Sequence, residues 1–253
     1  MLNEQEWNTI NNILLELYTI DDIDMLSQKL MYVIRMLIPF TKGYFILLNE
    51  DQQIIPDRTY FLGMDTHAVE QYIYHYYDKD YLKYLYALCV ETTVYKDSNI
   101  LTDEIRKSTE FYQDFLQPAD IPFGCGILII QSHHIVGIFN LFRSEKLGDF
   151  TDKELYILNA LKKHIENMIR KSSEFSRQNA AVDKCIVGAS EKYALTNRES
   201  EILKLLSKGL SNNEICDRLF ISLSTVKKHV YHLYTKTGVK SRTQLINLIY
   251  QQA

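Results

Sequence analysis

Residues 211–238 have the sequence SNNEICDRLFISLSTVKKHVYHLYTKTG, which predicts two helices separated by a very short connection. Ser211 with Glu214 fits the S/T-x-x-E box, in which a hydroxyl and a later side chain satisfy free amide groups at a helix start. Ser222 is placed to cap a second helix, and Gly238 is placed to end it. A connection this short is typical of a helix-turn-helix. The predicted helices span residues 212–219 and 223–237.

Two more helices are predicted on either side of this pair. Thr196 with Glu199 and Ser241 with Gln244 form further capping boxes, and Gly209 is placed to end the first of these helices. The two flanking helices are expected over residues 197–208 and 242–251. The sequence thus predicts an all-α module of four short helices at the C-terminal end of the chain.

The third helix of this module has one apolar and one cationic face. A projection at 100° per residue places an apolar stripe toward the module's core, made of Val226, Val230, Leu233 and Thr237. The opposite face carries Ser224, Lys228, Tyr231 and Thr235, flanked by Lys227 and His232. Lysine donates hydrogen bonds to guanine acceptors, and a helix fits the major groove of DNA. A solvated charged face is the alternative, but the capped neighbouring helices favour DNA recognition.

The charge of the chain is divided unevenly between its two ends. Residues 190–253 contain ten Lys and Arg against five Asp and Glu, whereas residues 1–189 contain 18 against 27. A small basic module on a larger acidic body indicates that the module binds a polyanion.

The stretch LTNRESEILKLLSKGLSNNEICDRLFISLSTVKKHVYHLYTKTGVKSRTQLI, residues 195–246, resembles the LuxR-type helix-turn-helix of bacterial transcription regulators. The resemblance implies positions in or at the edge of the DNA groove for Thr225, Lys227, Lys228 and Tyr231. It implies positions near phosphates for Ser211, Asn212, Lys236, Lys240 and Arg242. Cys216 stands where the family usually has alanine and is expected to be small and buried, and His229 is expected to pack at the edge of the core.

The larger part of the chain has a mixed pattern of helices and strands. Helices are expected at 4–18 and 22–38, a strand at 43–48, and a hairpin over 125–131 and 135–142 that turns around Ser132, His133 and His134. Thr151 and Glu154 cap a long helix. In it a narrow apolar seam suits either a partner helix or the protein's own sheet; its residues are Leu158, Leu161, Ile165 and Met168.

Residues 20–170 are similar to GAF-like sensory domains, most clearly in VGIFNLFRSEKLGDFTDKELYILNAL. The resemblance implies an α+β domain with a sheet and flanking helices. The Asn-Lys pair of cyclic-nucleotide-binding GAF domains falls at Arg143 and Ser144, so a cyclic-nucleotide ligand is not supported, and the signal stays unknown.

Seven tyrosines lie within residues 72–86. They suit a ligand cavity, although ordinary helix packing or a dimer surface explains them more simply.

Neither enzyme nor membrane chemistry is expected. Asn49, Glu50 and Asp51 follow a strand, but the chain lacks the strand and helix alternation of a phosphoacceptor receiver, and it has no Gly-rich phosphate loop. The four cysteines are too scattered for disulfides or zinc pairs, so we expect free thiols, no metal and no cofactor. The chain lacks a signal peptide or a long apolar run, which predicts a cytoplasmic protein.

The sequence predicts a DNA-binding transcription regulator with three parts. A GAF-like sensory or dimerisation domain is expected over 1–175, a linker over 176–190 and the DNA-binding domain over 191–253. The expected partners are double-stranded DNA and a second copy of the chain, with RNA polymerase a further candidate that the resemblance implies. The alternative function is a DNA-binding assembly protein whose large domain only dimerises and binds no ligand.

Overall fold

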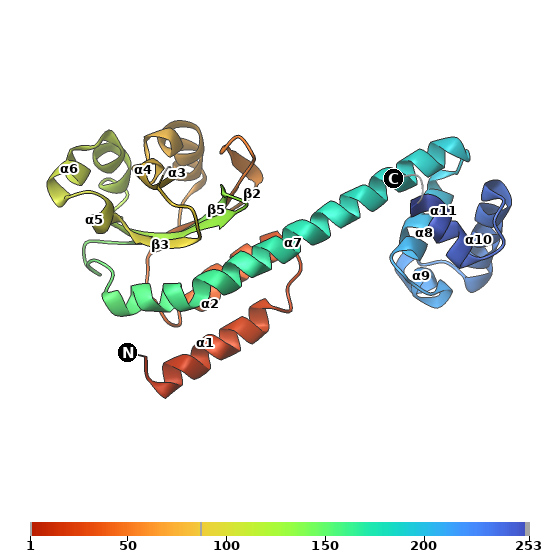
Figure 1. The fold of residues 1–253 in the computed structure, drawn as a ribbon, viewed down its shortest axis with the longest axis horizontal. Coiled ribbons are helices and arrows are strands. Elements are labelled where there is room, and N and C mark those ends of the chain that lie inside the picture. The colour runs from red at the N-terminus through yellow and green to blue at the C-terminus, as the bar shows by residue number, and fades with distance from the viewer. Residues whose placement is uncertain (1, 87, 251–253) are drawn as a thin grey trace. The chain divides into compact units, whose positions relative to one another are not determined.

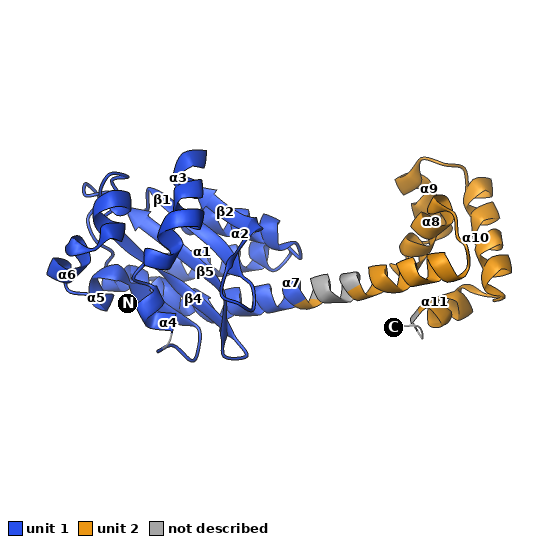
Figure 2. Cartoon of the chain, turned by 90° about the horizontal axis from the view of Figure 1, so that it is seen from above, with its two compact units in different colours: residues 1–173 blue, residues 174–253 orange. Residues whose placement is uncertain are grey.

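The computed structural model describes residues 2–86 and 88–250, and the side chains of residues 175–180 and 250 lie outside this description. The chain forms two compact units, residues 1–173 and residues 174–253 (Figure 2). None of the helices in the described part of the chain combines the length and apolar character that a membrane crossing requires.

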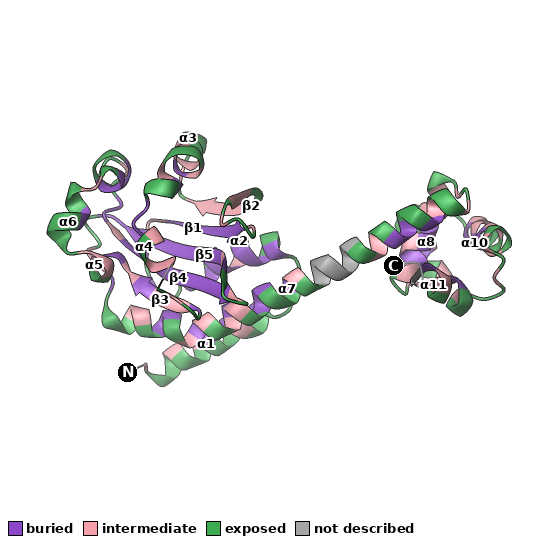
Figure 3. Ribbon diagram, turned by 45° about the horizontal axis from the view of Figure 1, so that its top comes forward, coloured by how far each residue is buried: buried purple, intermediate pink, exposed green. Residues whose placement is uncertain are grey.

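The N-terminal unit is built on one antiparallel sheet in the order β2-β1-β5-β4-β3. Its strands are β1 (Lys42–Leu48), β2 (Ile54–Leu62), β3 (Thr93–Lys96), β4 (Phe123–Gln131) and β5 (His134–Arg143). The middle strands β1, β5 and β4 are buried on both faces (Figure 3). Helices cover the two faces, and the expected GAF-like α+β class is confirmed.

Three helices cover one face of the sheet (Figure 1). They are α1 (Glu4–Leu17), α2 (Ile23–Ile34) and the first part of α7 (Asp152–Lys192). The seam residues of α7, Leu158, Leu161, Ile165 and Met168, are all buried in the core that these helices form with the sheet. The seam therefore packs within its own unit, and the alternative of a partner helix along it is wrong.

Short helical segments cover the other face of the sheet. They are α3 (Thr66–Gln71), η1 (Tyr72–Tyr76), η2 (Tyr77–Lys79), α4 (Lys83–Tyr86), α5 (Asp97–Ile100), α6 (Asp103–Ser108) and η3 (Phe111–Leu116). Of the seven tyrosines in this region, Tyr72, Tyr77 and Tyr81 are buried in an aromatic core, whereas Tyr74 and Tyr84 are exposed. The tyrosine-rich stretch thus serves mainly to pack these segments on the sheet.

The hairpin between β4 and β5 turns at Ser132 and His133, whose φ angles are 50° and 65°. Two consecutive positive φ angles are the geometry that matches the twist of paired strands. The hairpin is therefore confirmed, with His134 as the first residue of β5 rather than part of the turn.

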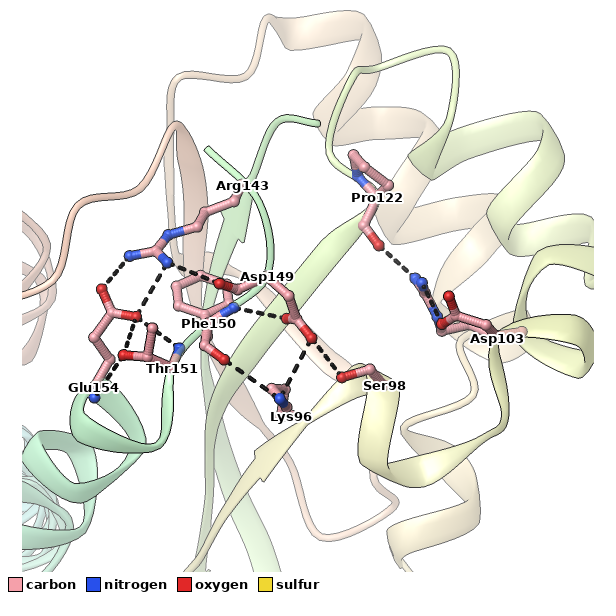
Figure 4. A network of polar contacts seen from close by, with 10 residues as sticks. Lys96, Ser98, Asp103, Pro122, Arg143, Asp149, Phe150, Thr151 and Glu154 are labelled. Atoms are coloured by element: carbon pink, nitrogen blue, oxygen red, sulfur yellow. Dashed lines mark hydrogen bonds and ion pairs between the residues drawn. The ribbon is translucent and has the colours of Figure 1, made fainter. Parts of the chain in front are cut away.

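A polar network holds the segment between β5 and α7 (Figure 4). Arg143 pairs with Glu154 and donates from Nε to the Pro39 carbonyl oxygen at 2.7 Å. Thr151 and Glu154 form the predicted cap at the start of α7. Burial alone would raise the pKa of Glu154, but hydrogen bonds from Arg143 and Thr151 outweigh it and hold the pKa below its ordinary value. Arg143 thus has a structural role here.

The C-terminal unit packs four helices and the end of α7 around one apolar core. The helices are α8 (Asn197–Ser207), α9 (Asn212–Leu219), α10 (Leu223–Thr237) and α11 (Arg242–Tyr250). All four agree with the predicted spans to within one residue over the described part of the chain; residue 251, the predicted end of the last helix, lies outside it. Residues 176–190, expected to form a linker, lie instead within α7, and Cys185, Ile186 and Ala189 are buried in this core.

Candidate nucleic-acid interface

The start of α10 is fixed by hydroxyl groups from its own first turn. Ser222 accepts a hydrogen bond from the Thr225 amide at 3.2 Å. The Ser222 hydroxyl also lies 2.7 Å from that of Ser224 and 2.8 Å from that of Thr225. Three hydroxyl groups therefore gather at the N-terminus of α10, where the helix dipole attracts anions.

The two faces of α10 differ as the projection predicted. Val226, Val230 and Leu233 are buried, while Lys228 is exposed and Tyr231 keeps 68% of its surface in solvent. No hydrogen bond or ion pair within the described residues occupies the Lys228 ammonium group. The helix thus presents a free cation and an aromatic hydroxyl group to the solvent.

A surface groove of about 400 Å³ lies beside this face. Ser211, Asn212 and Asn213 at the start of α9 line one part of it, and Lys227 of α10 lines another. The remaining lining residues are Leu206, Leu223, Val230, Tyr234 and Arg242. The structure therefore brings the α9 start and the α10 cation together around one groove.

Two of the cations expected near phosphates are bonded within the unit. Arg242 donates from its two terminal nitrogens to the carbonyl oxygens of Leu206 and Leu210, both at 2.7 Å. Lys236 donates to the Ala194 carbonyl oxygen at 2.8 Å and pairs with Glu199 at 2.7 Å. Both groups stabilise the packing of the helices, and a contact of either with phosphate stays a prediction.

Glu199 is a buried carboxylate that links α8 to α10. Burial by itself would raise its pKa, but hydrogen bonds from Lys236 and from the Thr196 amide outweigh burial and hold the pKa below its ordinary value. His232, half exposed on α10, has its Nδ1 atom 3.7 Å from the Glu199 carboxylate. His232 therefore faces the α8 side of its helix and is less available to DNA than Lys228.

Lys240 lies exposed in the loop before α11. Its amide donates to the Gln244 side chain at 2.9 Å, while the Ser241 hydroxyl accepts from the Gln244 amide at 3.2 Å. The predicted capping box of Ser241 and Gln244 is therefore confirmed in one of its two hydrogen bonds. The Gln244 side chain accepts from the Lys240 amide and not, as a capping box requires, from the Ser241 amide. The Lys240 ammonium group is left in solvent.

Three features of this unit were missed or only partly foreseen. Phe220, in the turn between α9 and α10, is 94% exposed with a φ of 52°, an unusual exposure for an aromatic residue. Cys216 is only partly buried against the core. His229 lies at the edge of the core as expected, but its Nδ1 atom is buried without a partner in the described residues. His229 and His232 were not predicted as a pair, although their H-x-x-H spacing is a signal by which the pair could have been found.

Comparison with known proteins identifies this unit. Residues 193–249 match the family described as bacterial regulatory proteins, luxR family. Residues 193–249 form a LuxR-family helix-turn-helix domain. In this LuxR-family domain, α9 and α10 are the two helices joined by the short turn, and α10 presents the exposed cationic face.

Known proteins resemble this chain over different parts of its length. The CsgBAC operon transcriptional regulatory protein of Escherichia coli is 52% identical over 59 residues, which cover 23% of this chain and only 27% of that regulator. The monoamine regulon transcriptional regulator of Klebsiella aerogenes is 26% identical over 91% of this chain and 92% of its own length. The VqsR LBD domain of Pseudomonas aeruginosa superimposes with a TM-score of 0.51 at 14% identity and covers 65% of this chain and 96% of that domain. The last likeness shows a shared fold of the N-terminal unit.

Proposed function

We propose that this protein is a sequence-specific DNA-binding transcription regulator, in which α10 enters the major groove. The observation that carries the proposal is the free ammonium group of Lys228 on an exposed face whose opposite side is anchored by Val226 and Leu233. A helix held by its buried stripe presents its outward side chains in fixed positions, as base recognition requires. Regulators are also what the similar E. coli and K. aerogenes proteins are named.

The outward side chains divide into two roles. Those on the exposed face of α10 lie where they reach base edges or the groove wall: Ser224, Thr225, Lys227, Lys228 and Tyr231. Ser211 and Asn212 at the start of α9, and Lys240 before α11, lie where only the DNA backbone is expected, because each is outside α10. Backbone contacts position the domain, whereas base contacts give it sequence preference.

The N-terminal unit supports a sensory role through buried polar groups on its aromatic face. Tyr44, Asn140, Gly126 and Tyr95 are successive partners across β1, β5, β4 and β3, so their side chains share one face of the sheet. The Tyr95 hydroxyl and the Asn140 Oδ1 atom are buried without partners in the described residues. Gly126 lets the Tyr95 side chain lie this close to the strand, because a Cβ atom there would lie only 2.7 Å from the Tyr95 hydroxyl.

Two buried carboxyl groups lie over this row. Asp80 accepts from the Tyr72 hydroxyl at 2.9 Å, and Asp97 accepts from the Tyr81 hydroxyl at 2.8 Å. Burial raises the pKa of Asp80 to about 7 and that of Asp97 to about 6. Buried polar groups without partners lower the stability of the folded state. The arrangement therefore favours a small ligand whose own polar groups form hydrogen bonds with the unpaired Tyr95 hydroxyl and Asn140 Oδ1 atom.

A second function of the N-terminal unit, assembly into a homodimer, is favoured by exposed apolar side chains. Met25, Tyr32 and Met36 are more than half exposed, and they recur at spacings of seven and four along and just beyond α2. The α7 seam is buried and cannot contact a second copy of the chain. The exposed stripe of Met25, Tyr32 and Met36 is therefore the surface proposed for dimer formation. Sensing and assembly are compatible, because they use opposite faces of the sheet.

Selection of bound fragments from random DNA tests the regulator proposal. The full-length protein should enrich one motif, and a dimer should enrich it as an inverted repeat with half-sites about one helical turn apart. Recovery of fragments without any common motif would contradict sequence-specific binding.

The mass in solution, measured for wild type and for Tyr32→Glu, tests assembly: wild type should be dimeric and the variant monomeric.

Ligand binding is tested by the thermal unfolding of the N-terminal unit, followed by the fluorescence of its Trp7, the only tryptophan of the chain. Fractions of a cell metabolite extract should contain one that raises the unfolding temperature of wild type but not of Asn140→Leu. Tyr95→Phe, measured without extract, should raise the free energy of unfolding by about 1 kcal/mol, because it removes a buried unpaired hydroxyl. A loss of stability in Tyr95→Phe would show that the hydroxyl is already paired and would favour assembly alone.

A further inference from the structure

Three side chains of metal-binding type meet between α8 and α10, beside the surface proposed for DNA. They are Glu199, His229 and His232, and their potential ligand atoms all lie within 4.8 Å of one another. His229 and His232 are three residues apart on α10 and therefore point to the same side of the helix. Glu199 approaches from the first turn of α8.

One carboxylate oxygen of Glu199 is directed toward these histidines. Its Oε2 atom accepts from the Thr196 amide at 2.8 Å and from the Lys236 ammonium group at 2.7 Å. Its Oε1 atom lies 3.7 Å from Nδ1 of His232. The bonds to Oε2 hold the carboxylate in place and keep it ionised, so Oε1 remains as an oriented anionic ligand atom.

His229 supplies an independent indication of a missing partner. Its Nδ1 atom is buried and has no hydrogen-bond partner in the described residues. A buried imidazole nitrogen without a partner costs free energy, which a bound metal ion would offset. The ring lies 6.4 Å from that of His232, centroid to centroid.

We propose that Glu199, His229 and His232 bind one divalent transition-metal ion of the zinc class. Two imidazoles and one carboxylate are a donor set that such ions take, usually with water as the fourth ligand. Ligand atoms on a tetrahedral ion lie roughly 3.4 Å apart, so the widest gap in the cluster must close by roughly 1.4 Å. His232 is half exposed and can rotate to do this.

The ion would connect α10, which carries the exposed face proposed for DNA, to α8. Binding would hold α10 to α8 through both histidines and thus stabilise the LuxR-family domain in proportion to metal concentration. The Lys236 ammonium group beside Glu199 opposes a second positive charge and limits the affinity.

Titration of the full-length protein with Co²⁺ and Zn²⁺ in the absence of DNA tests the site. The titrations use a His133→Ala/His134→Ala background, which removes two adjacent exposed histidines that could bind metal on their own. We expect one ion per chain, with intense visible absorption bands of four-coordinate Co²⁺ that Zn²⁺ abolishes, and a higher unfolding temperature of the C-terminal unit.

His232→Ala should lower the metal affinity at least about tenfold, since loss of an outer-shell partner alone costs 10 to 100-fold. This side chain is half exposed, so the variant should fold, as circular dichroism will verify. His67→Ala, an exposed histidine of the N-terminal unit, is the matched control and should leave the affinity unchanged. No bound ion, or equal affinities of the background protein and His232→Ala, would overturn the proposal. Either result would leave the DNA-binding proposal intact, because these titrations contain no DNA.

Discussion

The two units place their polar side chains in opposite ways. The C-terminal unit buries the aliphatic side of α10 and leaves Lys228 and Tyr231 in solvent. The N-terminal unit instead buries carboxyl and hydroxyl groups, such as Asp80 and Tyr95, between its sheet and a layer of short helices. An exposed cationic face suits a large polyanion, whereas an enclosed polar face suits a small partner. The two units should therefore respond differently to truncation, pH and loss of single side chains.

The largest effect should come from truncation of the C-terminal unit. A fragment of residues 174–253 should fold and bind DNA, whereas residues 190–253 lack Cys185, Ile186 and Ala189 of the core. Their burial contributes roughly 3–5 kcal/mol, enough to leave the shorter fragment largely unfolded. Far-ultraviolet circular dichroism and gel shifts at one salt concentration measure both properties.

The fragment of residues 1–173 is the control for DNA binding, because it is acidic and should not shift DNA. Equal stability of the two C-terminal fragments would show that the end of α7 is dispensable for that unit. DNA binding by residues 1–173 would reverse the assignment of roles.

The next effect is the pH dependence of stability, which we expect for the N-terminal unit because it buries Asp80. Asp80 is protonated in the folded protein up to its pKa of about 7 but ionises near pH 4 when unfolded. The unfolded state thus binds fewer protons in this window, and stability should fall by up to about 1.4 kcal/mol per pH unit from pH 4 to 7, with no further change from this group above. Chemical denaturation followed by Trp7 fluorescence measures this slope.

Asp80→Asn should flatten the slope and make the unit more stable than wild type at pH 8, while Asp51→Asn, an exposed carboxyl in a turn, should leave it unchanged. Burial raises the pKa of Asp97 to about 6, so a smaller slope should persist in Asp80→Asn. Identical slopes in wild type and Asp80→Asn would contradict the claim that burial raises the pKa of Asp80.

A smaller effect distinguishes structural cations from those free for DNA. Arg242→Ala removes two hydrogen bonds to the carbonyl oxygens of Leu206 and Leu210 and should cost about 2–3 kcal/mol. Lys240→Ala changes an exposed side chain and should stay within about 0.5 kcal/mol of wild type. Thermal unfolding of residues 174–253, monitored by circular dichroism, compares the two. Equal stabilities would mean that Arg242 does not hold α8.

The sequence predicted most of the C-terminal unit because its determinants are local. Thr196, Ser211 and Ser222 each cap a helix within three residues, as the structure confirms. The exposed face of α10 followed from the spacing of its buried valines. What was missed there is non-local: Arg242 reaches carbonyl oxygens 32 and 36 residues away, which no short pattern reveals.

In the N-terminal unit the strands β2 and β3 were not predicted. β2 lies at an edge and contains Pro56, with polar residues in its middle, and β3 has only four residues, so neither shows a clear apolar pattern. The alignment of Tyr44, Asn140, Gly126 and Tyr95 across the sheet could not be predicted from the sequence either. It depends on the register of the strand pairs, which places Tyr44 opposite Asn140 and Tyr95 opposite Gly126. The long helix was predicted, but the partner of its seam depended on packing that periodicity does not determine.

The central claim, that α10 recognises bases, is tested most directly by competition titrations of Lys228→Ala and Lys240→Ala against specific and scrambled DNA at several salt concentrations. Lys228→Ala should cost about 1–3 kcal/mol on the selected sequence and relax preference at one base pair. Lys240→Ala should weaken binding to both DNAs equally and lower the salt slope by about one. If Lys228→Ala instead lowers the affinity for both DNAs by the same factor, Lys228 contacts phosphate and α10 does not read the groove as proposed.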